Sequence, residues 1–288
     1  LDRRRRYPCG EIKLLYLWLM FIKPKDMKTK VYFLFTLMFC FLLNINAADN
    51  VNGNGTLSTK TIKIDDFNEV RINGLMDFNY EQSDEAGSLE ITLDENLHQY
   101  INIDIHDRVL TLGFDKKVKV GKVTKFIVKT NSKWLKKTKI AGNANFMVNS
   151  KLTGDELEIK ANDNCLVQFK KSVEVGVIDL DVSGSANMVI EELKADKLNC
   201  NMGGSGSIRL KNGSAKQGNF TTLSSGDIHA FGIAIPDVKC KMAGSGLMEI
   251  HPTANLNASL VGKGNIRYKG PATVQQRTIG KGKIEEVK

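Results

Sequence analysis

Apolar and polar residues alternate along most of the chain after residue 60, as in Leu198-Asn199-Cys200-Asn201-Met202. A period of two places successive side chains on opposite faces of a strand, so each such segment predicts a strand with one face in a core. Runs of β-branched and apolar residues predict further strands in the first half, at residues 61–64, 70–72, 89–93, 101–105, 109–112 and 126–128. No long helical period follows residue 48, so the pattern predicts an all-β protein.

A five-residue station recurs through the second half of the chain. Its central positions are spaced 20, 22, 20, 20, 20, 18 and 18 residues apart. The stations are Gly142-Asn143-Ala144-Asn145-Phe146, Asn162-Asp163-Asn164-Cys165-Leu166, Gly184-Ser185-Ala186-Asn187-Met188, Gly204-Ser205-Gly206-Ser207-Ile208, Ser224-Ser225-Gly226-Asp227-Ile228, Gly244-Ser245-Gly246-Leu247-Met248, Gly262-Lys263-Gly264-Asn265-Ile266 and Gly280-Lys281-Gly282-Lys283-Ile284.

Each column of the station has a physical meaning. The first column holds Gly except at Asn162 and Ser224, which indicates positive φ or a cramped bend. The middle column holds Gly, Ala or Asn and demands small side chains, while the last column is apolar throughout and faces a core. The predicted corner glycines are Gly142, Gly184, Gly204, Gly206, Gly226, Gly244, Gly246, Gly262, Gly264, Gly280 and Gly282.

A period near twenty residues is too short for a strand plus a crossover helix. The sequence therefore predicts a parallel β-helix, a solenoid in which coils of short strands stack about 4.8 Å apart. Residues 140–288 carry the repeats, and residues 60–139 form an irregular β-rich part that caps or continues the solenoid. Cys200 and Cys240 each lie six residues before a middle-column Gly, with Phe220 at the same place between them. We expect an inward Cys-Phe-Cys ladder whose sulfur atoms are too far apart for a disulfide.

The N-terminal 48 residues have the order of a targeting segment. Met27, two lysines and the apolar run Val31 to Leu43 precede a short polar stretch, which predicts a signal peptide over residues 27–48. Residues 1–26 are interpreted as an upstream extension and residues 49–59 as a flexible lead-in. The alternative is a membrane anchor made of this run and the earlier one, Ile12 to Ile22. We expect an exported protein (periplasmic, cell-surface or secreted) with no transmembrane span in its mature part.

The net charge of +9 does not indicate a nucleic-acid-binding protein. Nine Lys or Arg residues and three acids fall in residues 1–30, so the remaining chain carries only about +3. The basic feature that remains is the stretch 116–139, with ten lysines and no acid. Lysines on the solvent face of strands protect an unpaired edge. The sharper hypothesis is a surface that binds anionic glycans or the cell envelope through Lys133, Lys136, Lys137 and Lys139.

No residue pattern predicts catalysis, a metal or a cofactor. The four histidines, His98, His106, His229 and His251, lack the spacing of metal ligands. Gly204-Ser205-Gly206 lacks the wider spacing of a nucleophile elbow, and no station extends to a dinucleotide-binding motif. The period is also about twice that of calcium-binding β-helix repeats.

The predicted signal peptide is followed, in order, by the segment Phe67-Asn68-Glu69-Val70, an Asn73-Gly74 bend and repeated Gly-Ser-Gly stations. On this order of features, residues 60–288 resemble the head GIN domain family. This family is described as autotransporter adhesin heads. The resemblance implies a right-handed β-helix-like fold in an exported bacterial protein, and it brings no catalytic residues with it.

Three functions remain open at this point. The leading hypothesis is a non-enzymatic exported module that binds a cell-envelope or glycan ligand, as adhesins do. The alternative is a carbohydrate-active β-helix enzyme, a polysaccharide lyase or hydrolase, although the repeats lack long loops and aromatic residues are few after residue 140. The third is a regulatory or sensing ectodomain.

Overall fold

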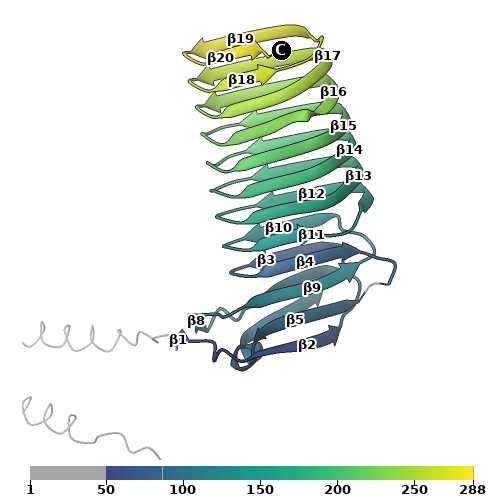
Figure 1. Ribbon diagram of the computed structural model, residues 1–288, viewed down its shortest axis with the longest axis vertical. Coiled ribbons are helices and arrows are strands. Elements are labelled where there is room, and N and C mark those ends of the chain that lie inside the picture. The colour runs from purple at the N-terminus through teal and green to yellow at the C-terminus, as the bar shows by residue number, and fades with distance from the viewer. Residues whose placement is uncertain (1–49, 86, 288) are drawn as a thin grey trace, which may run out of the picture. The chain divides into compact units, whose positions relative to one another are not determined.

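The computed structural model describes residues 50–85 and 87–287, which form a β-solenoid with stacked parallel rungs (Figure 1). The all-β parallel β-helix with an irregular β-rich N-terminal part is therefore confirmed. The strands are β1 (Asn50–Val51), β2 (Leu57–Lys63), β3 (Glu69–Asn73), β4 (Asp77–Gln82), β5 (Ser88–Asp94), β6 (Ile101–His106), β7 (Val109–Phe114), β8 (Lys119–Val120), β9 (Phe126–Ser132), β10 (Lys137–Ala141), β11 (Asn145–Val148), β12 (Leu152–Ala161), β13 (Leu166–Val182), β14 (Asn187–Met202), β15 (Ser207–Thr222), β16 (Asp227–Gly244), β17 (Leu247–Gly262), β18 (Asn265–Tyr268), β19 (Thr273–Gly280) and β20 (Lys283–Glu286). A 3₁₀ helix, η1 (Glu95–Tyr100), lies between β5 and β6.

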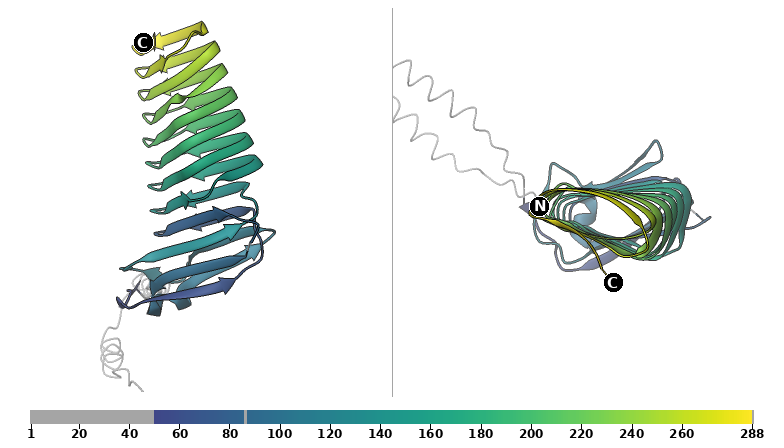
Figure 2. Two further views of the ribbon diagram at one scale, coloured as in Figure 1. Left: turned by 45° about the vertical axis from the view of Figure 1, so that its right-hand side comes forward. Right: turned by 90° about the horizontal axis from the view of Figure 1, so that it is seen from above.

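A single long strand forms most of each regular rung. β14, for example, runs for 16 residues, loses its inward–outward alternation at Glu191–Glu192 and at Asp196–Lys197, and ends at a sharp corner before β15. The end view shows two long sides that join at this corner and at a broader bend (Figure 2). We call the residues after a corner, such as Asn187–Ile190, the A side, and those before the next corner, such as Lys197–Met202, the B side.

The rungs stack in register, so each inward position becomes a column along the solenoid. On the A side Ile208 pairs with Ile228 and Ile228 with Met248, and each is fully buried. On the B side Cys200 pairs with Phe220, and Phe220 with Cys240. The predicted Cys-Phe-Cys ladder is confirmed, and both thiols are free and buried.

The second corner differs by one residue from the prediction. Asp163 has a φ of 63° and lies beneath Gly184, so it occupies the first column in place of Asn162. Val167, which pairs with Phe146 and Met188, is the buried residue, whereas Leu166 is 36% exposed. Cys165, not Asn164, therefore holds the middle column of this station. The distances from Ala144 to this position and from this position to Ala186, predicted as 20 and 22 residues, are 21 residues each. Asp replaces Gly here because a short polar side chain tolerates the left-handed region.

The two glycine columns have different causes. In the first column Gly142 and Gly184 have φ of 85° and 65°, in the left-handed region that favours glycine. In the middle column no glycine has positive φ, but a Cβ on Gly246 would lie 2.1 Å from the carbonyl oxygen of Gly226. In the rungs with a middle-column glycine the backbone of the preceding rung therefore leaves no room for a side chain, whereas Ala144, Cys165 and Ala186 hold the column in earlier rungs. The column as a whole requires small side chains, as predicted.

The N-terminal part contains a rung of the solenoid that the repeat search missed. β3 and β4 pair in parallel with β10 and β11, and Gly74 lies at the corner next to Gly142. On their other side β3 and β4 pair in parallel with β7 and β9. After β1 and β2, which lie outside this rung, the chain thus enters the stack one rung inside its end with β3 and β4, forms the terminal rung with β7 and β9, and returns to continue with β10.

Antiparallel strands cover this terminal rung. β5 pairs antiparallel with β9 and β2, and β6 pairs antiparallel with β7. The buried Asp94 carboxylate accepts hydrogen bonds from the backbone N–H groups of Gly55 and Thr124, at 2.9 and 2.8 Å. Residues 50–59, which were expected to be a flexible lead-in, therefore make specific contacts that include the pairing of β1 with β8.

The predicted upstream extension (1–26) and signal peptide (27–48) lie outside the described residues. Within residues 50–85 and 87–287, no helix is long and apolar enough to cross a membrane.

Candidate functional site

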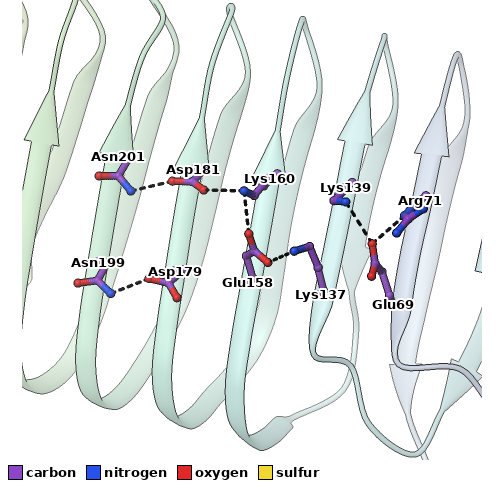
Figure 3. Close-up of polar contacts among 10 residues, drawn as sticks. All are labelled: Glu69, Arg71, Lys137, Lys139, Glu158, Lys160, Asp179, Asp181, Asn199 and Asn201. Carbon is purple, nitrogen blue, oxygen red and sulfur yellow. Dashed lines mark hydrogen bonds and ion pairs between the residues drawn. The ribbon is translucent and has the colours of Figure 1, made fainter. Parts of the chain in front are cut away.

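The outward side chains of the B side form polar ladders from rung to rung. Near the N-terminal end the ladder is ionic (Figure 3). The Lys160 ammonium lies 2.8 Å from Glu158 and 3.5 Å from Asp181, and Glu158 also pairs with Lys137. In the neighbouring rungs Glu69 pairs with Arg71 at 2.7 Å and with Lys139 at 3.5 Å.

The pKa values of these acids follow from this pairing. Partial burial alone would raise the pKa of Glu158, but the Lys137 and Lys160 ammonium groups outweigh it and hold the pKa below its usual range. Arg71 and Lys139 do the same to Glu69 against its own burial. Both acids are therefore ionised and held in ion pairs at neutral pH, which does not favour a role in proton transfer.

Three of the four lysines predicted to bind an anionic surface are part of these ion pairs. Lys136 lies 3.3 Å from Glu156, and Lys137 and Lys139 contact Glu158 and Glu69. Lys133 is exposed in the segment between β9 and β10, and its backbone N–H donates to Asp66. The structure brings the four lysines to one end of the B side, where neighbouring carboxylates neutralise much of their charge. Anionic-surface binding by this group stays a prediction.

Amide ladders replace the ionic ladder further along the B side. Asn199 donates to Asp179 at 2.6 Å, and Asn219 donates to Asn199 at 2.8 Å. Asn201 donates to Asp181 at 2.7 Å, as Figure 3 also shows. Side-chain amides both donate and accept, so such a ladder continues across any number of rungs and leaves amide groups at its end.

The amide ladder leads into a groove of about 360 Å³. The groove crosses β15, β16, β17 and β19 at the start of the B side, where a buried column of Gly218, Val238 and Leu256 forms part of its lining. Its outward lining is polar and carries both donors and acceptors: Gln217, Asn219, Asp237, Lys239, Asn255, Asn257, Thr273 and Gln275.

Sequence reasoning missed this groove. The available signal was the recurrence of amides at one outward position, Asn219, Asn257 and Gln275, which is interrupted by Lys239 in the repeat after Asn219. Because polar residues are ordinary on the solvent face of a strand, the signal gains meaning only when the register aligns them. The predicted corner glycines lie along the corner and do not line the groove.

The histidines do not form a reactive or metal-binding cluster in the described part of the chain. His229 contacts Glu249 at 2.7 Å on the A side, while His251 lies near Lys269, where burial and the ammonium lower its pKa. No group of three or more His, Cys, Asp or Glu among residues 50–85 and 87–287 could hold a metal ion. Burial raises the pKa of the Cys165 thiol to about 11, which makes it a poor nucleophile.

Comparison with known families identifies the fold. The family model described as "Putative auto-transporter adhesin, head GIN domain" matches residues 66–272. The chain belongs to the head GIN domain family. The match covers the N-terminal cap except β1 and β2, together with most of the rungs, so the family domain includes both irregular and regular parts of this solenoid.

Solved head GIN domain relatives have the same architecture. A putative adhesin from Parabacteroides merdae is 63% identical, with a TM-score of 0.82 and coverage of 84% of this chain and 100% of its own. A putative adhesin from Parabacteroides distasonis is 60% identical, with a TM-score of 0.81 and coverage of 83% and 100%. A third structure, of a putative lipid binding protein from Parabacteroides distasonis, is 30% identical, with a TM-score of 0.80 and the same coverage. Comparison with curated proteins finds no match.

Proposed function

We propose that this head GIN domain protein is an exported, non-enzymatic binding module of the adhesin type, and that the groove on its B side binds a glycan. The observation that carries the proposal is the alignment of outward polar side chains over four rungs around a cavity of about 360 Å³, with amides in β15, β17 and β19 and with Asp237 and Lys239 in β16. Sugar hydroxyls donate and accept hydrogen bonds, as amides do, and a concave site with several convergent polar groups is the usual form of a small-ligand site.

The rigidity of the scaffold supports this function. Long parallel strands hold the groove residues, so their positions are fixed before a ligand arrives. The carboxylate of the groove is already partly engaged, since Asp237 accepts a 2.8 Å hydrogen bond from Asn255. The arrangement offers hydrogen bonds without a paired acid and base, which favours binding over cleavage.

The descriptions of the relatives agree with a binding role. Two of them are described as putative adhesins and one as a putative lipid binding protein, and none of the three descriptions refers to an enzyme. The carbohydrate-active enzyme is retained as the competing outcome of the experiment.

A glycan and envelope-fraction array tests the proposal. The purified chain is compared with the double variant Asn257→Ala/Gln275→Ala, which removes two groove amides without a hydrogen-bond partner among the described residues. The control is Gln168→Ala, an outward amide on the A side. We expect the wild type and the control to bind the same glycan class, and the double variant to bind at least tenfold more weakly.

Three results would overturn the proposal. The first is equal binding by the wild type and the groove variant. The second is the absence of glycan binding by the folded wild type. The third is release of products from any bound polysaccharide, which would establish the enzyme instead.

A further inference from the structure

An apolar ridge follows the corner of the last four rungs. Its residues occupy the position just before the first station column, where Ala243 pairs with Val261 and Val261 with Ile279. Leu223 holds the same position one rung earlier, just before Ser224. The exposed fractions are 67% for Leu223, 46% for Val261 and 50% for Ile279, and Ala243 is exposed as well.

The ridge is confined to one end of the corner. In the preceding rungs the same position holds polar or small residues: Asn73, Ala141, Asn162, Ser183 and Gly203. The corner is convex, as Figure 2 shows, so a neighbouring rung cannot cover these side chains. Most exposed apolar residues are scattered singly, whereas a continuous row of them indicates contact with another apolar phase.

Unpaired cations lie on both sides of the ridge. Lys241 and Arg277 point outward two residues before Ala243 and Ile279, and Lys263 and Lys281 follow Val261 and Ile279 by two residues. All four are exposed, and none lies within 4 Å of a carboxylate of the described residues. This differs from the B-side lysines near the N-terminal end, which are paired with glutamates.

We propose that this ridge docks the protein onto an anionic lipid surface. A convex row of apolar side chains bordered by lysine and arginine fits the interface of a bilayer, where apolar groups enter the acyl boundary and cations contact phosphates. A protein partner would have to supply a narrow apolar groove with acids along both rims. A bilayer supplies both without a shaped partner. This inference is independent of glycan binding, because no groove residue belongs to the ridge.

Vesicle flotation tests the proposal with the purified chain. The vesicles are phosphatidylcholine alone or an equimolar mixture with phosphatidylglycerol. The ridge variant is Leu223→Asn/Val261→Asn/Ile279→Asn, and the charge variant is Lys263→Gln/Arg277→Gln/Lys281→Gln. The control is Leu75→Asn, an exposed leucine (54%) at the corner of the β3–β4 rung.

We expect the wild type and the control to float with the anionic vesicles and not with phosphatidylcholine alone. The ridge variant should bind at least tenfold more weakly, and the charge variant should lose both binding and its dependence on salt. Circular dichroism checks that each variant is folded, and the charge variant provides the test if the ridge variant is not.

The proposal is overturned if the folded wild type does not float with anionic vesicles, which includes the case of a protein partner, or if the charge variant binds as the wild type does. Groove variants should float normally, so failure of the glycan proposal and failure of this one are separate results.

Discussion

At both ends of the described solenoid the last rung lacks a neighbouring rung on one side, and the two ends differ in how the core next to it is protected from water. At the N-terminal end, antiparallel strands β2, β5 and β6 cover the open edges of the terminal rung and bury its apolar residues. At the other end, β19 and β20 pair on one side only among the described residues, and the inward positions near the end of β19 become polar, while Val274 and Ile284 remain apolar. Gln276 and Thr278 stand where the rung below has Ala258 and Leu260. A stack of rungs can therefore be closed by covering the last core layer or by making that layer wettable.

The largest expected effect comes from the regular rungs. Gly246→Ala places a methyl group against the carbonyl oxygen of Gly226, and backbone in a stacked rung cannot move aside without disturbing both neighbours. We expect a loss of about 3 kcal/mol, in the range of severe overpacking. Urea unfolding followed by circular dichroism measures it. Ser245→Ala at the adjacent exposed position is the control and should change stability by less than about 0.5 kcal/mol.

The cap should respond to loss of one buried carboxylate. Asp94→Asn replaces one of the two acceptor oxygens by an NH₂ group, so the backbone N–H of either Gly55 or Thr124 then faces a donor, and we expect a loss of about 2 kcal/mol. Hydrogen exchange should show faster opening of residues 50–63 than of β14. An exchange pattern equal to that of the wild type would contradict this account of the cap.

The same residue predicts the acid sensitivity of the cap. Burial alone would raise the pKa of Asp94, but the hydrogen bonds from Thr124 and Gly55 outweigh it, so the folded-state pKa is lowered. A lowered pKa contributes stability that is present above the ordinary value of about 4 and is lost as the pH falls through the folded value. The wild type should therefore lose cap protection at acidic pH, while Asp94→Asn should lack that dependence.

A stabilising change is expected inside the regular rungs. The Thr222 hydroxyl is buried between Met202 and Met242 and has no hydrogen-bond partner among the residues that the structure describes. Thr222→Val removes the unpaired hydroxyl at nearly constant volume, so we expect a gain of about 1 kcal/mol. Thermal unfolding measures the gain. The matched control, Thr221→Val on the outward face, should leave the transition unchanged.

The smallest effect on stability is expected from the lysines near the cap. Lys133→Gln/Lys136→Gln/Lys137→Gln/Lys139→Gln removes ion pairs that are partly exposed, and such pairs contribute less than about 1 kcal/mol each. The same variant tests the sequence-based hypothesis of anionic-surface binding. Unchanged, salt-sensitive binding to envelope fractions would remove that hypothesis, whereas a clear loss would support it.

The sequence predicted the regular rungs well because their chemistry repeats. The inward residues, the small middle column and the free cysteines all follow from a period of about twenty residues and a strand period of two. The corner at Asp163 was misplaced by one residue because Asp, Asn and Cys hide the glycine pattern there. The β3–β4 rung was missed because its neighbour along the solenoid, β10–β11, is separated from it by the whole insertion that forms the cap.

The groove and the ridge were not predicted, since both are properties of aligned outward positions. A single outward Asn257 or Val261 does not indicate a binding surface in the sequence. The surface forms only when this residue is aligned with residues one and two rungs away, and that alignment depends on where each corner lies.

The placement of β3 and β4 inside the stack has a consequence for the order of folding. Contacts between regular rungs join residues 20 apart, as between Asn199 and Asn219, whereas contacts from the β3–β4 rung to β11 join residues 68 apart. By loop-closure entropy the longer closure costs about 1 kcal/mol more. We therefore expect the folding transition state to contain paired regular rungs, while the contacts between the β3–β4 rung and β10–β11 are not yet formed. Substitutions in the cap should accelerate unfolding, and substitutions in β14 to β16 should slow refolding.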